Sequence, residues 1–165
     1  MTSSRPVTIF NTPYECALRA GALLMYAHPI GLDLQRLVYL DYLLVHSGDA
    51  DGPASLHAAM PQRTAEWTVR RERVKSGVHA LACRRLAAVS YRQDGIHYVA
   101  TESLAPVMRS FTTSYALGVL QRAKWATRTY LTVPEEELAT LTRNNVTNWG
   151  GEFSFEAREW EGSGD

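Results

Sequence analysis

Apolar residues near the start of the chain recur at helical spacing and form one stripe. Thr12, Pro13 and Glu15 have the order of an N-cap, a first-turn proline and a capping-box glutamate, so a helix is expected to begin there. The stripe ends at His28, because a residue before proline, here Pro29, avoids the helical conformation.

A second helix is expected from the cap residue Asp33 to His46, with Gly48 placed to end it in the left-handed conformation. Apolar residues cover more than half of its circumference, which predicts a central helix packed on several sides. Asp41 interrupts this apolar surface, and a buried carboxylate is costly unless it is paired. We expect a buried structural carboxylate that acts as an internal cap or pairs with an arginine of the third helix. A functional carboxylate with a raised pKa is the alternative.

The third helix is expected from about Thr64 to about Leu86, after a long loop at 47–63. Basic residues crowd its start and outnumber the two acidic ones there. They are Arg63, Arg70, Arg71, Arg73 and Lys75. Cations at a helix N-terminus oppose the macrodipole, so helix stability does not explain them. They form either a solvated face or a contact surface for phosphates or an acidic protein.

Residues 88–101 predict a β-hairpin directly after this helix. Asp94 and Gly95 are expected to form its two-residue turn, with positive φ at both positions. That register pairs Arg92 with His97 near the tip, as a solvent-facing pair that a partner would be able to contact.

Two more helices are expected, one from Ser103 and one from Tyr115 to Leu131, packed across the first helix or forming an oligomer surface. Pro134 opens a short helix with glutamates in its first turn, where the dipole favours them. Residues 152–160 alternate briefly like an edge strand and contain aromatic side chains, which is compatible with a docking segment.

The net charge of zero hides an asymmetry. Residues 1–134 carry 15 Lys/Arg and 9 Asp/Glu, a balance of +6, whereas residues 135–165 carry 2 and 8, a balance of −6. The acidic end is compatible with folding back on the body, with binding a basic partner, or with a solvated tail.

The sequence contains no catalytic motif, no ligand set with metal spacing and no phosphate-binding loop, so we expect no enzyme, no cofactor and no metal. The acidic residues around Gly52 lack the later oxygen ligands of a calcium loop. No apolar run is long enough to span a bilayer, and we expect a cytoplasmic protein. Cys16 and Cys83 are expected to be buried, reduced thiols.

The order of helix, helix, long helix and hairpin predicts a mostly α, α+β fold of the winged helix-turn-helix type, with a two-stranded wing and extra C-terminal helices. We expect this domain over residues 1–133, followed by an acidic helix and tail over 134–165. The 17-residue loop before the third helix is unlike the tight turn of a DNA-reading unit.

The segments LDYLLVHSGD, SLH and RRE, with the stretch from YVATESLAPVM to SYALGVLQRAKW, resemble the middle component of bacterial three-component ABC ATPase systems. The resemblance covers about residues 14–130. It implies a non-enzymatic adaptor that links an ABC-type ATPase to an effector in defence against phage or plasmids. It also makes the basic start of the third helix, and the loop around Ser55 and His57, candidate contacts for the ATPase or for nucleic acid held by it.

Three classes of function therefore stay open. An adaptor predicts a stoichiometric complex with an ATPase. A winged-helix transcriptional regulator predicts a dimer that binds DNA in a salt-dependent way through Arg70 and Arg71. An enzyme is the least expected, because the five histidines are scattered and none has a nucleophile or metal ligands at a suitable spacing.

Overall fold

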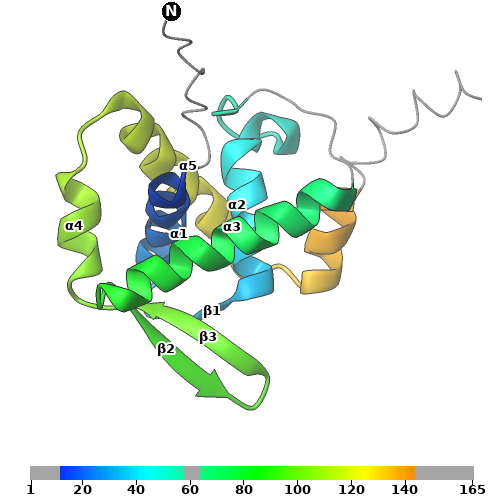
Figure 1. Ribbon diagram of the computed structural model, residues 1–165. Helices are drawn as coiled ribbons and strands as arrows, with labels where there is room; N and C mark the ends of the chain where they lie inside the picture. The colour runs from blue at the N-terminus through cyan, green and yellow to red at the C-terminus, as the bar shows by residue number, and fades with distance from the viewer. Residues whose placement is uncertain (1–11, 58–63, 144–165) are drawn as a thin grey trace, which may run out of the picture.

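The computed structural model describes residues 12–57 and 64–143. Helices and a small antiparallel sheet form a mostly helical α+β fold (Figure 1). The helices are α1 (Pro13–Ala27), α2 (Leu34–Val45), the 3₁₀ helix η1 (Ser47–Ala50), α3 (Thr64–Cys83), α4 (Leu104–Ser110), α5 (Ser114–Tyr130) and a further helical stretch at 135–143. The strands are β1 (Leu32–Asp33), β2 (Ala87–Arg92) and β3 (Gly95–Ala100).

Helix α1 begins where its capping signal predicts. The Thr12 hydroxyl accepts a hydrogen bond from the Glu15 N–H, and the Glu15 carboxylate accepts one from the Thr12 N–H, each at 3.3 Å. Asp33 caps α2 in the same way, through the Arg36 N–H at 2.7 Å. These caps satisfy backbone donors that the first helical turn leaves free. Both predicted helix starts are therefore confirmed.

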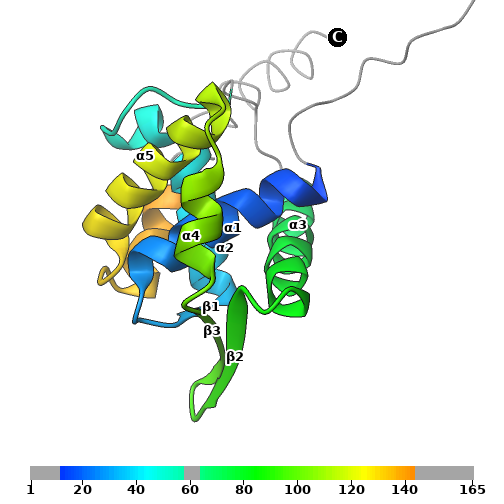
Figure 2. The same ribbon diagram turned by 90° about the vertical axis from the view of Figure 1, so that its left-hand side faces the viewer.

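Helix α2 is the centre of the core. Residues 37–45 are all buried, and the predicted central role of this helix is confirmed. Each leucine removed from water in this way stabilises the fold by roughly 1.5–3 kcal/mol. Figure 2 shows α1 between α3 on one side and α4 and α5 on the other. The two C-terminal helices thus pack on α1, which is one of the two arrangements expected for them.

The sheet has three strands rather than the two predicted. β1 pairs antiparallel with β3, which gives the strand order β1-β3-β2. Two residues are too few to show the alternation by which a strand is recognised in a sequence, so β1 was missed. Because β1 immediately precedes α2, it joins the hairpin to the helical core.

The hairpin register also differs from the predicted one. Arg92 pairs with Gly95, and the turn consists of residues 93–94. Gly95 takes the positive φ, 128°, whereas Asp94 does not. His97 consequently lies opposite Ser90 and not opposite Arg92. The predicted pair of Arg92 and His97 is wrong because the turn lies one residue earlier than expected.

Three smaller expectations need correction. Asp51, with φ of 56°, takes the left-handed conformation after η1, in place of Gly48. Helix α3 ends at Cys83 and not near Leu86, since Arg85 adopts a left-handed φ of 59°. Cys83 is exposed at this helix end, whereas Cys16 is buried as expected.

The end of the described chain is held against α2. The Arg36 guanidinium donates to the carbonyls of Tyr130, Leu131 and Val133 at 3.3, 3.1 and 2.8 Å, and so caps the C-terminus of α5. Leu138, in the stretch 135–143, is fully buried in a cluster with side chains of α2. The expected domain boundary between 133 and 134 stays a prediction. The strand-like segment at 152–160 lies outside the described residues.

Helices α1 and α3 cross closely at Gly77. A Cβ atom at this position would lie 2.7 Å from the carbonyl carbon of Cys16 and 2.8 Å from the nitrogen of Ala17. Backbone atoms cannot move aside as the end of a side chain can. Glycine is therefore required by the approach of the two helices.

We predict that Gly77→Ala lowers the free energy of unfolding by about 1–3 kcal/mol, because the added methyl group overpacks the crossing. Gly118→Ala in α5 is the matched control. Its new Cβ would meet only the ends of the Leu56 and Arg122 side chains, so the gain in helix propensity, about 1 kcal/mol, keeps it near neutral. Urea denaturation of both variants measures the difference, and equal effects would contradict the close crossing.

Candidate functional site

Asp41 lies at the centre of a buried ionic cluster. Its carboxylate accepts a hydrogen bond from Arg19 of α1, Nε to Oδ1 at 2.6 Å, and from Arg70 of α3, Nη1 to Oδ2 at 2.7 Å. Asp41 and Arg19 are each 2% exposed. The Arg70 guanidinium also lies over the Tyr42 ring, 5.5 Å from its centroid. Arg70 is the α3 arginine that the sequence led us to expect, and Arg19 is a second partner that it did not.

The two arginines decide the charge of this cluster. Burial by itself would raise the pKa of the Asp41 carboxyl, but the guanidinium groups of Arg19 and Arg70 outweigh it and hold that pKa below its usual range. Burial likewise opposes the charge on Arg19, and Asp41 outweighs it and raises the pKa of the guanidinium. All three groups are therefore charged. The raised pKa expected for the alternative, a functional carboxylate, is wrong.

The two loop residues suggested as partner contacts bind within the protein. The Ser55 hydroxyl oxygen accepts a hydrogen bond from the Gly48 N–H at 3.0 Å. His57 Nε2 lies 3.2 Å from the Tyr115 hydroxyl, and the two rings stack at 16° with centroids 6.2 Å apart. Burial lowers the pKa of His57 and raises that of Tyr115. These contacts hold the loop against η1 and α5.

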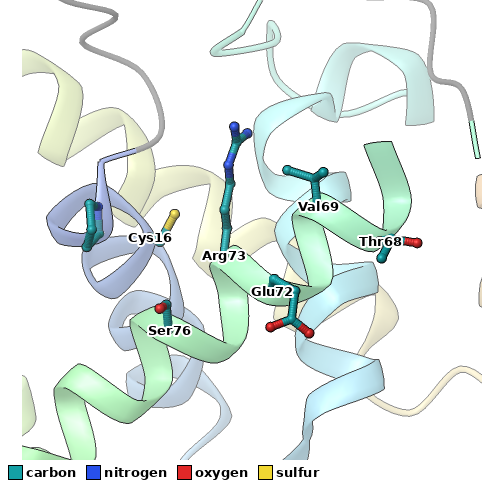
Figure 3. A pocket seen from close by; sticks show the side chains of 7 residues that line it. Cys16, Thr68, Val69, Glu72, Arg73 and Ser76 are labelled. Carbon is teal, nitrogen blue, oxygen red and sulfur yellow. The ribbon is translucent and has the colours of Figure 1, made fainter. Parts of the chain in front are cut away.

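The basic residues of α3 do not form one patch. Arg70 points inward to Asp41, whereas Arg71 is exposed and donates from Nη1 to the Gln35 side chain of α2 at 2.8 Å. Arg73 lies on the opposite flank, beside Cys16 of α1 (Figure 3). Lys75 is exposed. Arg63 lies outside the described residues.

The hairpin places its two suggested contact residues differently. His97 is 6% exposed, and its Nε2 lies 3.4 Å from Asp94 and 4.0 Å from Asp33. Arg92 is exposed, and its guanidinium lies over Gly31. His97 is thus a packed residue where β1 pairs with the hairpin, and Arg92 is the one of the two that is accessible to a partner.

One face of the hairpin is apolar and open to solvent. Val89 is 42% exposed, Tyr91 81% and Ile96 49%. Tyr91 and Ile96 are cross-strand partners, and Val89 is two residues from Tyr91, so all three lie on the same face. Isolated exposed apolar residues are ordinary, but a contiguous group of them marks a binding surface.

Sequence reasoning missed Arg19, although a signal was present. It lies three residues after Cys16 on the buried side of α1, just as Asp41 lies on the buried side of α2. Opposite charges on two apolar helix faces are a sign of an ion pair between them. Within 12–57 and 64–143, no group of three or more His, Cys, Asp or Glu side chains is placed to hold a metal ion. The same residues include no helix long and apolar enough to cross a membrane.

These observations define a small, mostly helical α+β protein in which buried charges pair between helices and the hairpin presents exposed apolar side chains. Residues 9–152 match the family model described as ABC-three component (ABC-3C) system Middle Component 2, and the chain belongs to this family. This confirms the resemblance found in the sequence. The family name implies association with the other components of the system, including the ATPase, and it does not name a catalytic family. No curated protein and no solved structure matches the chain.

We predict that Asp41→Asn lowers the free energy of unfolding by about 3–5 kcal/mol, because it leaves the buried Arg19 charge uncompensated. Asp49→Asn is the matched control, since Asp49 is exposed on η1, and we expect it to change stability by no more than about 0.5 kcal/mol. Chemical denaturation at pH 7 compares the two. A small effect of Asp41→Asn would contradict the assigned role of the ionic cluster.

We predict that stability also declines as the pH falls from about 6.5 to about 4. Burial, with Arg70 adding to it, lowers the pKa of His46 to about 4, whereas the unfolded chain has an imidazole pKa of about 6.5. The unfolded state therefore binds the proton first, and up to roughly 3 kcal/mol is lost across this window.

The Asp41 contribution behaves differently, because a lowered carboxyl pKa gives stability that is lost only at still lower pH. His46→Phe keeps the ring contact with Tyr42, at 5.0 Å between centroids, and should flatten the decline. Replacement of the exposed His28 by Gln is the control. Unfolding curves measured at several pH values test this, and a wild-type stability that does not vary between pH 6.5 and 4 would contradict it.

Proposed function

We propose that the protein is a non-enzymatic adaptor that links the ABC-type ATPase of its system to an effector, in bacterial defence against phage or plasmids. Membership of the middle-component family is the observation that carries this proposal. The cluster around Asp41 supports it, because both oxygens of the buried carboxylate are bound by guanidinium groups, Oδ1 by Arg19 and Oδ2 by Arg70.

We further propose that the fold is a winged helix. The element order α1-β1-α2-α3-β2-β3 and the sheet order β1-β3-β2 support this assignment, with β2 and β3 as the wing. Winged helices serve in protein contacts as well as in DNA binding, so the fold alone does not select between the adaptor and a regulator.

We assign the ATPase contact to the wing. Its open face carries Val89, Tyr91 and Ile96, and the exposed Arg92 adds a cation on the opposite face of the same strand. Aromatic and arginine side chains are the usual anchors of protein interfaces. The exposed Arg71, Arg73 and Lys75 are secondary candidates for the ATPase contact. Ser55 and His57 contribute to it indirectly, because they hold their loop in position.

DNA binding, the alternative function, has less support. Arg70, which a recognition helix would offer to DNA, is bound to Asp41. Arg71 and Arg73 lie on different flanks of α3. A dispersed set of cations contacts few phosphates at once, and phosphate contacts supply most of the affinity of such proteins.

We predict that the tagged protein, expressed from its own locus, co-purifies with an ABC-type ATPase in stoichiometric amount, with or without ATP and after nuclease treatment. Replacement of Tyr91 and Ile96 by Ser should reduce the recovered ATPase at least about tenfold, the effect of losing about 1.4 kcal/mol of binding free energy. Mass spectrometry of the purified complexes measures the recovery.

Leu117→Ser is the matched control, because Leu117 is an apolar side chain of α5 that is 53% exposed. If the wing variant recovers as much ATPase as the wild type, the contact would be assigned to α3 instead of the wing. Recovery of the protein alone, or with DNA only, would overturn the adaptor proposal and favour the regulator.

A further inference from the structure

Strand β2 is an open edge of the sheet. It comes last in the order β1-β3-β2, and in the described part of the chain β3 is the strand with which it pairs. Figures 1 and 2 show no described helix or strand along the side of β2 that faces away from β3. Residues 88–92 are exposed or half-buried, whereas Ala87 is buried. The open stretch of the edge is therefore 88–92.

The register of the hairpin identifies the main-chain groups on the open side. The Thr101 N–H donates to the Leu86 carbonyl at 3.1 Å, and these two residues face each other when the β2–β3 register is continued. In an antiparallel pair, hydrogen-bonded and non-hydrogen-bonded residues alternate. The even-numbered residues of β2 therefore bond to β3. Within the open stretch, Val89 and Tyr91 direct their N–H and C=O groups away from β3.

This edge lacks the features that keep sheet edges apart. Proteins protect an exposed edge with proline, with a bulge or with charged side chains along the strand. The open stretch reads AVSYR and contains no proline, and its pairing with β3 is continuous, without a bulge. Its one charge, Arg92, lies at the tip of the wing. An edge of this kind is a template for another strand.

A second copy of the same strand complements this edge. When two copies run antiparallel with Ser90 facing Ser90, Val89 of each copy lies opposite Tyr91 of the other. Each of these two pairs exchanges two main-chain hydrogen bonds. A β-branched residue opposite an aromatic one is also a favourable cross-strand pair. Arg92 lies opposite Ala88, so no like charges face each other across the new contact.

The ends of the paired strands carry opposite charges. In this register the tip of one wing reaches the base of the other wing. The tip carries Asp94, whose side chain is 72% exposed, and the base carries the exposed Arg85. The same contact occurs twice, because the two copies are related by a two-fold axis. Charge complementarity therefore favours this antiparallel arrangement.

We propose that two copies of the chain dimerise through β2, antiparallel and with Ser90 at the two-fold axis, to form one six-stranded sheet from the three strands of each copy. Strand addition extends a sheet in its own plane, so Tyr91 and Ile96 stay on an open face. The dimer presents two such wing faces side by side. The inference goes beyond the adaptor role and does not depend on it, because a dimer is compatible with an adaptor and with a regulator.

The first test is a disulfide placed at the two-fold axis. Facing residues of a non-hydrogen-bonded antiparallel pair have Cα atoms about 4.5 Å apart, which a disulfide is able to bridge. Ser90→Cys should therefore give a covalent dimer of the full chain under mild oxidation with diamide. The exposed Cys83 is replaced by Ser in every variant of this test. Non-reducing electrophoresis and mass spectrometry measure the product.

Ala88→Cys is the matched control. Ala88 lies on the same face of β2 and is more exposed than Ser90, so random collisions would link it at least as well. In the proposed dimer the two copies of position 88 are four positions apart along the strands, roughly 13 Å. We expect no covalent dimer from this variant. Linkage of Ala88→Cys to the same extent as Ser90→Cys would overturn the proposal.

The second test uses the chain without added cysteines. Because the contact is one strand edge, we expect sedimentation velocity to show a monomer that becomes a dimer at micromolar concentration. Val89→Pro removes an N–H on the open side and no hydrogen bond of the hairpin, so it should weaken dimerisation at least about tenfold. Val89→Thr keeps the N–H and the branched shape, and it should leave dimerisation within about twofold of the wild type.

Hydrogen exchange provides a readout for each amide. The Val89 and Tyr91 amides should exchange more slowly as the wild-type concentration rises, and the amides that bond to β3 should not change. A wild type that stays monomeric at millimolar concentration would overturn the proposal, and so would a Val89→Pro variant that folds and dimerises normally. Protection of the two amides that appears only with the ATPase bound would instead assign the edge to a strand of the ATPase.

Discussion

The pairing of one buried carboxylate with two arginines constrains the arrangement of three helices. Asp41 would be costly to bury alone, and so would Arg19. Because Arg19 comes from α1 and Arg70 from α3, each helix must present its guanidinium to the same point on α2. Apolar packing tolerates small shifts of one helix against another, whereas two charge-assisted hydrogen bonds of 2.6 and 2.7 Å tolerate few. The cluster therefore defines how the helices sit, and the apolar residues around it supply most of the stability.

The same constraint changes the interpretation of the basic third helix. In the sequence, Arg70 belongs to a run of cations that suggests a surface for phosphates. In the fold, it is bound to Asp41 and covers Tyr42. Its neighbours Arg71 and Arg73 then fall on opposite flanks, since successive helical residues are turned by about 100°. A local excess of charge along a helix is therefore weak evidence for a continuous basic surface.

A feature could be predicted from the sequence where the interacting residues lie close together along the chain. Thr12 and Asp33 cap helices through residues three positions away, so their signals are local and the helix starts were predicted correctly. The partners of Asp41 lie 22 and 29 residues away, and the helical pattern shows only that a charge is on the buried face, not which arginine it meets. Gly77 was overlooked for the same reason. Only the backbone of α1, which is distant in the sequence, leaves no room for a side chain at this position. The hairpin was recognised, but a one-residue shift of the turn moved His97 from the surface to the interior.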